Sequence, residues 1–183
     1  MDALLASGRD DIPECQESDF RAAAGKFASG VTVVTTRNGC EVYGKTVSAF
    51  GSLSLDPLMV SVSIGRLSPL VAAILKAEVF AVSVLRHDQQ QVSRHFSTRG
   101  NGRALGAFPS VGTEKAVTGA PVISGCLSYF DCRLENVVGG GDHAIIIGRV
   151  AAAAGGDGKP LLYFDGDYRE IRSTAPVAGV PAH

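Results

Sequence analysis

Hydrophobic and polar residues alternate along much of the chain, and this pattern predicts more strands than helices. The clearest case is the segment 127–138, in which Phe130, Cys132 and Leu134 are separated by charged residues. Alternation with a period of two is typical of a strand with one buried face. Runs rich in β-branched and other apolar residues predict further strands at residues 31–36, 58–64, 79–85, 144–150 and 161–164.

Helical spacing of apolar residues occurs in three places. Ser18 can cap a first helix that ends at Gly30, and Ser68, followed by a proline, can cap a second. Asp88 can cap a third helix, which we expect to stop at Gly100. The apolar stripes of these helices are Phe20, Ala24 and Phe27; Leu70, Val71, Ile74 and Leu75; and Val92 and Phe96.

Strands follow strands with few intervening helices, and this order predicts the fold class. The Asn38-Gly39 pair between two β-rich runs is a strong hairpin signal. Residues 97–119 indicate an irregular connection and residues 151–159 an alanine- and glycine-rich turn. We therefore expect a mostly antiparallel sheet closed into a barrel, not a doubly wound fold. One domain is predicted over residues 18–172, with a flexible leader at 1–17 and a flexible tail at 173–183.

Composition narrows the class of protein further. The 183 residues are 45% hydrophobic and 19% charged, with a formal net charge of −1. This argues against disorder, and the lack of basic surplus argues against nucleic-acid binding. No apolar run reaches the roughly 18–20 residues that span a bilayer, and no secretory signal is evident, so we expect a cytoplasmic protein outside the membrane.

Four cysteines, at positions 15, 40, 126 and 132, have neither Cys-x-x-Cys nor metal-ligand spacing. We expect all four to be buried thiols and no metal to be bound. The spacing of Cys126 and Cys132 predicts that both point to one strand face.

Residues Gly39–Thr46 match the Walker A pattern GxxxxGK[ST]. A phosphate-binding loop of this kind must join a strand to a helix whose N-terminus faces the anion. Here the glycine belongs to the predicted hairpin and the residues that follow are β-prone. We interpret the match as accidental.

Small hydroxyl side chains are concentrated in the segment 44–57, and Ser61 and Ser63 follow on one face of the next predicted strand. Such residues and their main-chain amides can hydrogen-bond the edge of a flat heterocycle or a phosphate. Arg66 and Ser68, at a helix start, can add a guanidinium and a positive dipole for a phosphate. From spacing alone, a serine-rich loop beside an ordinary capped helix is the favoured explanation of these residues.

Two further segments carry candidate chemistry. Three glycines precede Asp142 and His143, so a ligand can come close to an imidazole that can stack on or donate to a planar amide. A solvated turn before a buried strand explains the same pattern. The segment 163–169 places aromatic and charged residues around a glycine, and either closes one side of a pocket or forms a final hairpin.

Taken together and in order, these segments resemble the short-chain flavin reductases with an FMN-binding split barrel, the reductase components of two-component flavin-dependent monooxygenases. The resemblance runs from about Phe20 to Arg169. The segments that carry it are FASGVTVVT at 27–35, GKTVSAFGSLSLDP at 44–57, VFAVSVL at 79–85, residues 89–96, Gly-Asp-His at 141–143 with Gly148, and PLLYFDGDYR at 160–169. The implied fold is mainly β with a few helices, an antiparallel, Greek-key-like split barrel.

The resemblance also implies roles for individual residues. Flavin would be bound at Thr46, Val47, Ser48, Ala49, Phe50, Ser61, Val62, Ser63, Arg66, Ser68 and Ser83, with Arg66 and Ser68 at the phosphate. The nicotinamide would be contacted by Gly141, Asp142, His143 and Tyr168, with His143 as the catalytic residue and Asp142 positioning its loop. Ala49 and Ser83 depart from the family, which has a serine and an asparagine there.

The implied reaction is hydride transfer from NADH or NADPH to FMN or FAD, in which the cofactors carry the chemistry and the protein orients them. The resemblance further implies a homodimer and a separate oxygenase that receives the reduced flavin by diffusion. Two alternatives remain open on the sequence: a split-barrel module that binds flavin or another planar ligand without turnover, and a P-loop nucleotidase at Gly39–Thr46.

Overall fold

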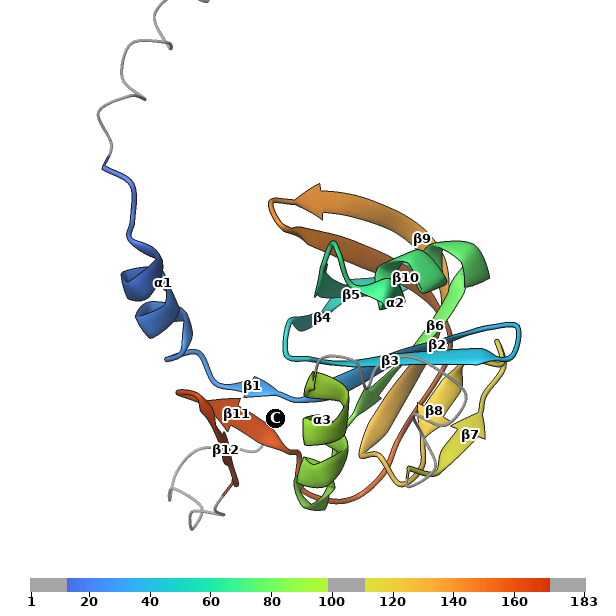
Figure 1. Cartoon of the computed structure of the whole chain (residues 1–183). Helices are drawn as coiled ribbons and strands as arrows, with labels where there is room; N and C mark the ends of the chain where they lie inside the picture. Colours follow the sequence, from blue (N-terminus) through green and yellow to red (C-terminus); the bar gives the residue numbers. More distant parts are fainter. Residues whose placement is uncertain (1–12, 99–110, 172–183) are drawn as a thin grey trace, which may run out of the picture.

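An antiparallel sheet of seven strands, in the order β3-β2-β6-β9-β10-β5-β4, forms the body of this computed structural model (Figure 1). The structure describes residues 13–98 and 111–171. The seven strands are β2 (Thr32–Asn38), β3 (Glu41–Val47), β4 (Phe50–Leu55), β5 (Leu58–Gly65), β6 (Val79–Val84), β9 (Ser128–Gly140) and β10 (His143–Gly155). The two edge strands, β3 and β4, are joined by Ser48 and Ala49 alone, so the curled sheet brings its edges together at this link.

Smaller elements surround this sheet. Two short sheets consist of β1 (Ser29–Gly30) with β11 (Leu162–Phe164) and β12 (Asp167–Arg169), and of β7 (Thr113–Lys115) with β8 (Pro121–Ile123). The helices are α1 (Glu17–Ala24), α2 (Pro69–Ala77) and α3 (Gln90–Ser97), with a 3-10 turn, η1 (His87–Gln89), before α3. The predicted mainly antiparallel β architecture with a few helices is confirmed.

The hairpin predicted at Asn38-Gly39 is present between β2 and β3. Asn38 pairs with Glu41, and Gly39 has a φ of +61°, a conformation that glycine adopts readily. Residues 41–47 then continue as strand β3 and not as a helix. The Walker A match is therefore part of a hairpin, and it lacks the helix N-terminus that a phosphate-binding loop needs.

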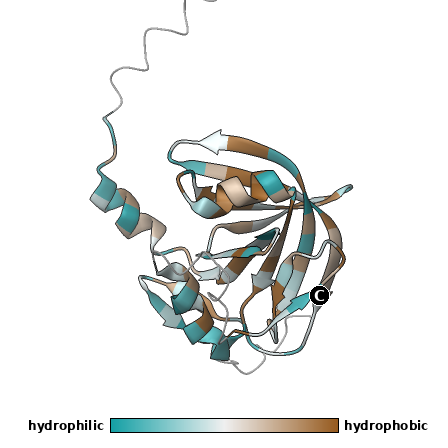
Figure 2. Cartoon of the chain, turned by 45° about the vertical axis from the view of Figure 1, so that its right-hand side comes forward, coloured by the Kyte–Doolittle hydropathy of each residue, from teal (hydrophilic) through white to brown (hydrophobic). Residues whose placement is uncertain are grey.

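The main hydrophobic core lies on the inner face of the curled sheet, the face that α2 covers. Val60, Val62 and Ile64 of β5 alternate with half-exposed residues, as the pattern predicted, and pack there with the buried side of α2. On β9, Cys132 is fully buried in this core, with Phe130 and Leu134 against it. Figure 2 shows the hydrophobic residues gathered along the strands and α2, whereas α1 is largely hydrophilic.

A second core lies on the outer face of the sheet, where β7, β8 and α3 cover β2 and β6. Strand β6 is consequently buried on both sides: Phe80 and Val82 face the inner core, whereas Ala81 packs against Val122 of β8. Strands of this kind do not show a period of two in their burial.

Several helix predictions need correction at their ends. The first helix ends at Ala24, well short of Gly30, because the chain turns at residues 25–27 to enter β1. Leu75 of α2 is 52% exposed, because five residues after Leu70 the helix has rotated about 140° away from the buried stripe. The predicted stop at Gly100, and the predictions for the leader before residue 13 and the tail from residue 173, lie outside the described residues.

Two segments predicted as irregular contain strands. Residues 151–155, expected to be a turn, extend β10 and pair with the first residues of β9 across a register shift near Ala151. Residues 113–115 form β7 within the segment expected to be an irregular connection. In both cases pairing with a distant strand overrides a weak local signal.

The expectation for the cysteines is only partly correct. Cys132 is buried, but Cys15 and Cys40 are exposed. Cys126 packs against the outer-face clusters whereas Cys132 lies in the inner core, so the two do not share a face. The strand begins only at Ser128, so the period-two argument does not extend back to residue 126.

Candidate functional site

A cleft of about 510 Å³ opens beside the link between the two sheet edges, and we refer to it as the cleft. This volume lies within the range of pockets that hold small molecules and cofactors. Four chain segments line it, and they supply Ala24, Gly25, Phe27 and Ser29; Ser48, Ala49, Phe50 and Gly51; Ser61 and Ser63; and Tyr163 and Asp165.

One wall of the cleft consists of short side chains and main chain. Ser61 and Ser63 point out of β5 on the face opposite its buried valines, and Ser48 and Ala49 lie in the link that precedes β4. The link is tied to β5 by a hydrogen bond of 3.0 Å from the Ser63 amide to the Ala49 carbonyl. Because these side chains are short, the flat face of a ligand can approach the backbone of this wall.

The hydroxyls on this wall are free to bind a ligand. Within residues 13–98 and 111–171, those of Ser48, Ser61 and Ser63 make no hydrogen bond to the protein. Buried hydroxyls elsewhere are engaged: that of Thr36 donates to the Val79 carbonyl at 2.6 Å, and that of Ser93 bonds to Tyr168 at 2.9 Å. The cleft therefore gathers the unused hydrogen-bonding capacity that a heterocycle edge needs.

His143 lies on the same sheet face as these serines. It is the first residue of β10 and pairs with Gly65 of β5, while Ile145, two residues on, pairs with Ser63. Residues directly opposite in an antiparallel pair share a face, and two residues along a strand span about 7 Å. His143 therefore lies beside the C-terminal end of β5, at the position on this face that follows Ser63.

Asp142 fixes the orientation of the His143 ring. Its Oδ1 lies 2.7 Å from His143 Nδ1, and this hydrogen bond, with the nearby imidazole and Arg66, holds the pKa of Asp142 below its usual value. The ionised carboxylate accepts a hydrogen bond from the Nδ1–H group, and this leaves Nε2 directed away from Asp142. The tight turn at Gly141 (φ +63°) presents both side chains to solvent.

The predicted phosphate end adjoins this turn. The Arg66 amide donates to the Asp142 carbonyl at 2.9 Å, so the start of α2 and the β9–β10 turn are fastened together. Ser68 precedes α2 and does not cap it with its side chain, so its hydroxyl is not used by the helix. Arg66 thus lies next to Asp142, and Ser68 follows it at the start of α2.

The opposite lip of the cleft is built from the two ends of the domain. The β11–β12 turn, with positive φ at Asp165 and Gly166, holds Asp165 against the segment after α1. The Asp165 carboxylate forms an ion pair with Lys26 Nζ at 2.6 Å, and the Asp165 amide donates to the Gly25 carbonyl at 2.9 Å. This lip contributes one carboxylate, already neutralised by a lysine, and two aromatic rings, Phe27 and Tyr163.

Five of the eleven predicted flavin-binding residues line the cleft: Ser48, Ala49, Phe50, Ser61 and Ser63. Arg66 and Ser68 lie at the start of α2 and are not among the residues that line it. Ser83 is fully buried on the outer face of β6, where its Oγ accepts a hydrogen bond of 3.0 Å from the Ile123 amide. It is therefore unavailable to a ligand, and its assignment needs correction. The side chains of Val47 and Val62 are buried in the inner core, so only their main chain can contribute.

Two other assignments also change in character. The Thr46 hydroxyl donates to the Ser93 carbonyl at 2.6 Å and so anchors α3 instead of facing the cleft. Tyr168 does not line the cleft; its hydroxyl bonds to Ser93, and its ring packs edge-on against Tyr163 at 5.6 Å between centroids. Tyr168 supports the lip from behind.

Several cleft residues were not assigned a role from the sequence. Phe27 was predicted only as part of the apolar stripe of the first helix, and Ser29 and Gly51 lie in motifs without an assigned role. Tyr163 and Asp165 lie in the segment for which a pocket wall was one interpretation. No local signal distinguishes Phe27 from a core residue of a helix. Its place follows from the pairing of Ser29 with Tyr163, residues far apart in the chain.

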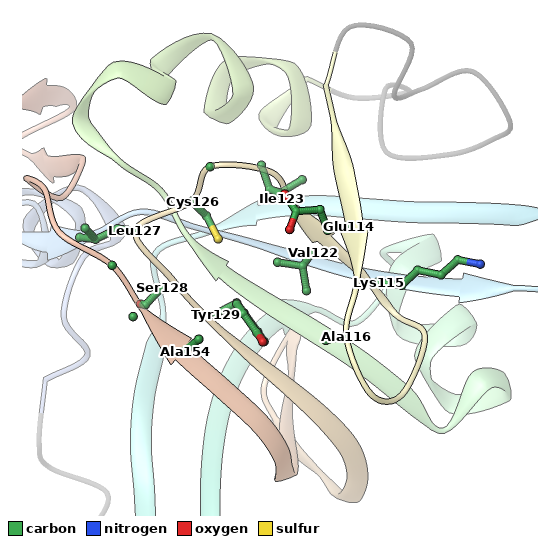
Figure 3. Close-up of a pocket in the computed structure, with 13 residues that line it drawn as sticks. Glu114, Lys115, Ala116, Val122, Ile123, Cys126, Leu127, Ser128, Tyr129 and Ala154 are labelled. Atoms are coloured by element: carbon green, nitrogen blue, oxygen red, sulfur yellow. The ribbon is translucent and has the colours of Figure 1, made fainter.

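A second hollow, of about 250 Å³, lies elsewhere, between β7, β8 and the start of β9 (Figure 3). Cys126, Tyr129 and Glu114 contribute its polar groups, and burial raises the pKa of the Cys126 thiol, which keeps it neutral. None of the predicted site residues lines it. In the described part of the chain, no helix is long and apolar enough to cross a membrane, and no three His, Cys, Asp or Glu side chains cluster as a metal site would require.

Comparison with known proteins gives consistent results. The sequence model of the flavin reductase-like domain matches residues 24–172. The reductase component of 4-hydroxyphenylacetate 3-monooxygenase from Thermus thermophilus is 40% identical over 154 residues, which cover 83% of this chain and 95% of the relative. An NADH-dependent FMN reductase, SmoA, from Agrobacterium fabrum is 42% identical over 149 residues, or 81% of this chain and 83% of the relative.

A solved structure extends this likeness to three dimensions. The NADH:FAD oxidoreductase of Streptomyces globisporus C-1027, in complex with NAD and FAD fragments, superposes with a TM-score of 0.78 at 30% identity. The match covers 91% of this chain and 99% of that one. The curled sheet therefore belongs to a fold that is shared along nearly the whole length of both chains.

Proposed function

The chain belongs to the flavin reductase-like family, and from this premise we propose that it reduces FMN or FAD with NADH or NADPH, using the cleft as its flavin site. The observation that carries the proposal is the wall of unengaged serine hydroxyls with His143 on the same sheet face. A flavin, when bound, accepts the hydride that a reduced nicotinamide donates. The chain's own residues bind and orient the two partners.

The fit of a flavin to this site can be followed residue by residue. Ser48, Ser61 and Ser63 offer hydroxyls that both donate and accept, which suits a ring edge that carries carbonyl and N–H groups. Ala49 and Gly51 keep the wall low for a flat ring. Arg66 and Ser68, just before α2, supply a guanidinium and a hydroxyl for a phosphate, while Pro69 at the first helical position has no amide proton to offer.

His143 is assigned to the nicotinamide. Nδ1 is held by the Asp142 carboxylate, and Nε2 makes no hydrogen bond to another residue within 13–98 and 111–171, so Nε2 can meet the carboxamide of the donor. Asp142 is a positioning residue, because it acts through the imidazole. Gly141 allows the close approach of the donor to this turn.

Relatives indicate the use of the product. Those in Thermus thermophilus and Agrobacterium fabrum are named as a monooxygenase reductase component and an NADH-dependent FMN reductase. We assign this chain the same place: it supplies reduced flavin to a separate oxygenase. We further assign it a cytoplasmic location, where reduced nicotinamide is available, and place the reductase domain within residues 18–172.

The quaternary state is assigned as a homodimer. Leu53, Leu55 and Leu58 of the β4–β5 hairpin are exposed, and α1 buries none of its residues. Apolar residues gathered at a strand edge are typical of an interface with another chain. A second copy of this chain is the partner that the family resemblance implies.

The decisive measurement is NADH oxidation, followed by absorbance, with FMN, FAD or riboflavin added to the purified protein. Turnover with at least one flavin is expected, together with a yellow, saturable complex. Flavin binding without turnover would favour a non-catalytic binding module. If NADPH replaces NADH with equal rates, the donor site does not discriminate between them.

A further inference from the structure

Two large aromatic side chains at the lip of the cleft are exposed without an evident structural reason. Phe27 is 80% exposed and Tyr163 is 39% exposed, and both line the cleft. The other exposed large hydrophobic residues within 13–98 and 111–171 lie outside it. Phe27 also contributes to neither of the two main hydrophobic cores. The packing of the two cores therefore does not account for Phe27, which lies at the cleft.

Both rings stand on a backbone that is firmly held. The segment around Phe27 is fastened to the β11–β12 hairpin by the pairing of Ser29 with Tyr163 and by the Lys26–Asp165 ion pair. The Phe27 amide itself donates to the Ala24 carbonyl at 3.1 Å. The position of Phe27 at the lip is thus fixed by the fold before any ligand binds.

Tyr163 is supported through a chain of contacts. Its ring meets Tyr168 edge-on at 5.6 Å, with the planes inclined by 71°, and the Tyr168 hydroxyl lies 2.9 Å from Ser93 Oγ. Ser93 is fully buried in α3. The lip is therefore preorganised, which lowers the ordering cost of binding.

The cleft is chemically asymmetric as a result. Ser48, Ser61 and Ser63 offer hydrogen bonds from one side, whereas Phe27 and Tyr163 offer flat apolar surface from the other. A planar heteroaromatic ring needs both, because its edge is polar and its faces are not.

We propose that Phe27, backed by Tyr163, is a stacking wall that contacts a planar heteroaromatic ring bound in the cleft and so sets the affinity for that ring. The ring is the isoalloxazine of the flavin or a base of the nicotinamide dinucleotide, so the proposal rests on the proposed function. It adds a substrate-contacting residue that the motif comparison did not assign.

The test compares Phe27→Ala with Phe27→Tyr, which keeps a ring. FMN and FAD are titrated by flavin fluorescence, and NAD⁺ is titrated by calorimetry into the flavin-saturated protein. Stacking of aromatic pairs is worth about 0.5–1.5 kcal/mol, so Phe27→Ala should raise one dissociation constant about 2- to 12-fold. Phe27→Tyr should stay within about twofold of wild type. A change in the flavin arm identifies the isoalloxazine, and a change in the NAD⁺ arm alone identifies the dinucleotide.

Val117→Ala serves as the matched control, because Val117 is 70% exposed outside the cleft and should leave every titration unchanged. Unchanged affinity for all three ligands in Phe27→Ala would overturn the stacking wall while leaving the proposed function intact. A shift in sedimentation with unchanged affinity would reassign Phe27 to an interface between copies and would also overturn it. If the wild-type protein binds no flavin, the proposed function fails, and the stacking wall fails with it.

Discussion

At the scale of single residues, His143 has the most specific chemical role. We expect His143→Ala to raise the KM for NADH about 2- to 12-fold, the worth of one hydrogen bond, with little change in flavin affinity. The reason is that His143 stands at the end of the wall, beyond the serines to which we assign the flavin. Steady-state kinetics and flavin titration measure the two effects separately.

His87→Ala is the control for this substitution, since His87 is an exposed histidine of η1 and is not among the cleft residues. Equal losses of NADH and flavin affinity in His143→Ala would contradict the role given to the imidazole. Because the hydrogen bond from His143 holds the pKa of Asp142 below its usual value, its carboxylate is ionised at neutral pH. The pair should then persist across neutral pH, and it is lost only as the pH falls through the lowered pKa of Asp142.

Gly148 shows how a residue without a side chain can be required by packing. A Cβ there would lie 2.8 Å from Cys132 Cβ and would also collide with the Phe80 ring. We expect Gly148→Ala to lower the free energy of unfolding by about 1–3 kcal/mol, as overpacked cores do. Gly139→Ala, where a Cβ meets nothing within 4 Å, should leave it nearly unchanged. Denaturant unfolding of the two variants measures the contrast, and equal stabilities would show that the core around Phe80 can yield.

At the scale of elements, the segment 111–123 is attached to the outer face of the sheet by side chains that reach across from β2, β6 and β9. Ser83 accepts from the Ile123 amide, Thr35 donates to the Pro121 carbonyl, and the buried Asp131 accepts from the Thr118 amide at 2.7 Å. The segment 111–123 is thus held against the face of the sheet by hydrogen bonds from side chains and not by strand pairing with β2, β6 or β9. Ser83, which was expected to contact flavin, instead stabilises the attachment of this segment to the sheet.

We predict that Ser83→Ala lowers the free energy of unfolding by about 1–3 kcal/mol, because the Ile123 amide loses its acceptor in a buried setting. The KM for flavin should not change. Ser61→Ala, in the cleft, should weaken flavin binding and leave the free energy of unfolding nearly unchanged. Thermal unfolding and flavin titration of both variants provide the comparison. A Ser83→Ala protein of normal stability with weakened flavin binding would restore the original assignment.

At the scale of the whole molecule, the exposed β4–β5 hairpin and the unburied α1 are the features that the fold of one copy does not explain. We expect sedimentation equilibrium to give about twice the chain mass of 19.0 kDa. Replacing Leu55 and Leu58 by lysine should shift the protein toward monomers, because two charges would have to be desolvated at the interface. Val117→Lys, far from the hairpin in sequence and equally exposed to solvent, should not. A wild-type monomer would remove the assigned dimer.

The sequence by itself determined the features that depend on local physics. The period-two pattern in 58–64 fixed which side of β5 carries Ser61 and Ser63, because one face of that strand is buried and the other is not. Asn38-Gly39 fixed a hairpin, and with it excluded the phosphate loop. The resemblance also assigned Arg66, Asp142 and His143 to one site, and in the structure the Arg66 amide donates to the Asp142 carbonyl.

Only the tertiary structure decided the features that depend on what covers a strand or joins distant segments. Strand β6 is buried on both faces, so no alternation could show that Ser83 points away from the cleft. The alanines of 151–155 become strand because β9 pairs with them. Phe27 and Tyr163 meet at one lip through pairing of β1 with β11, near opposite ends of the chain, and local sequence carries no record of so distant a contact.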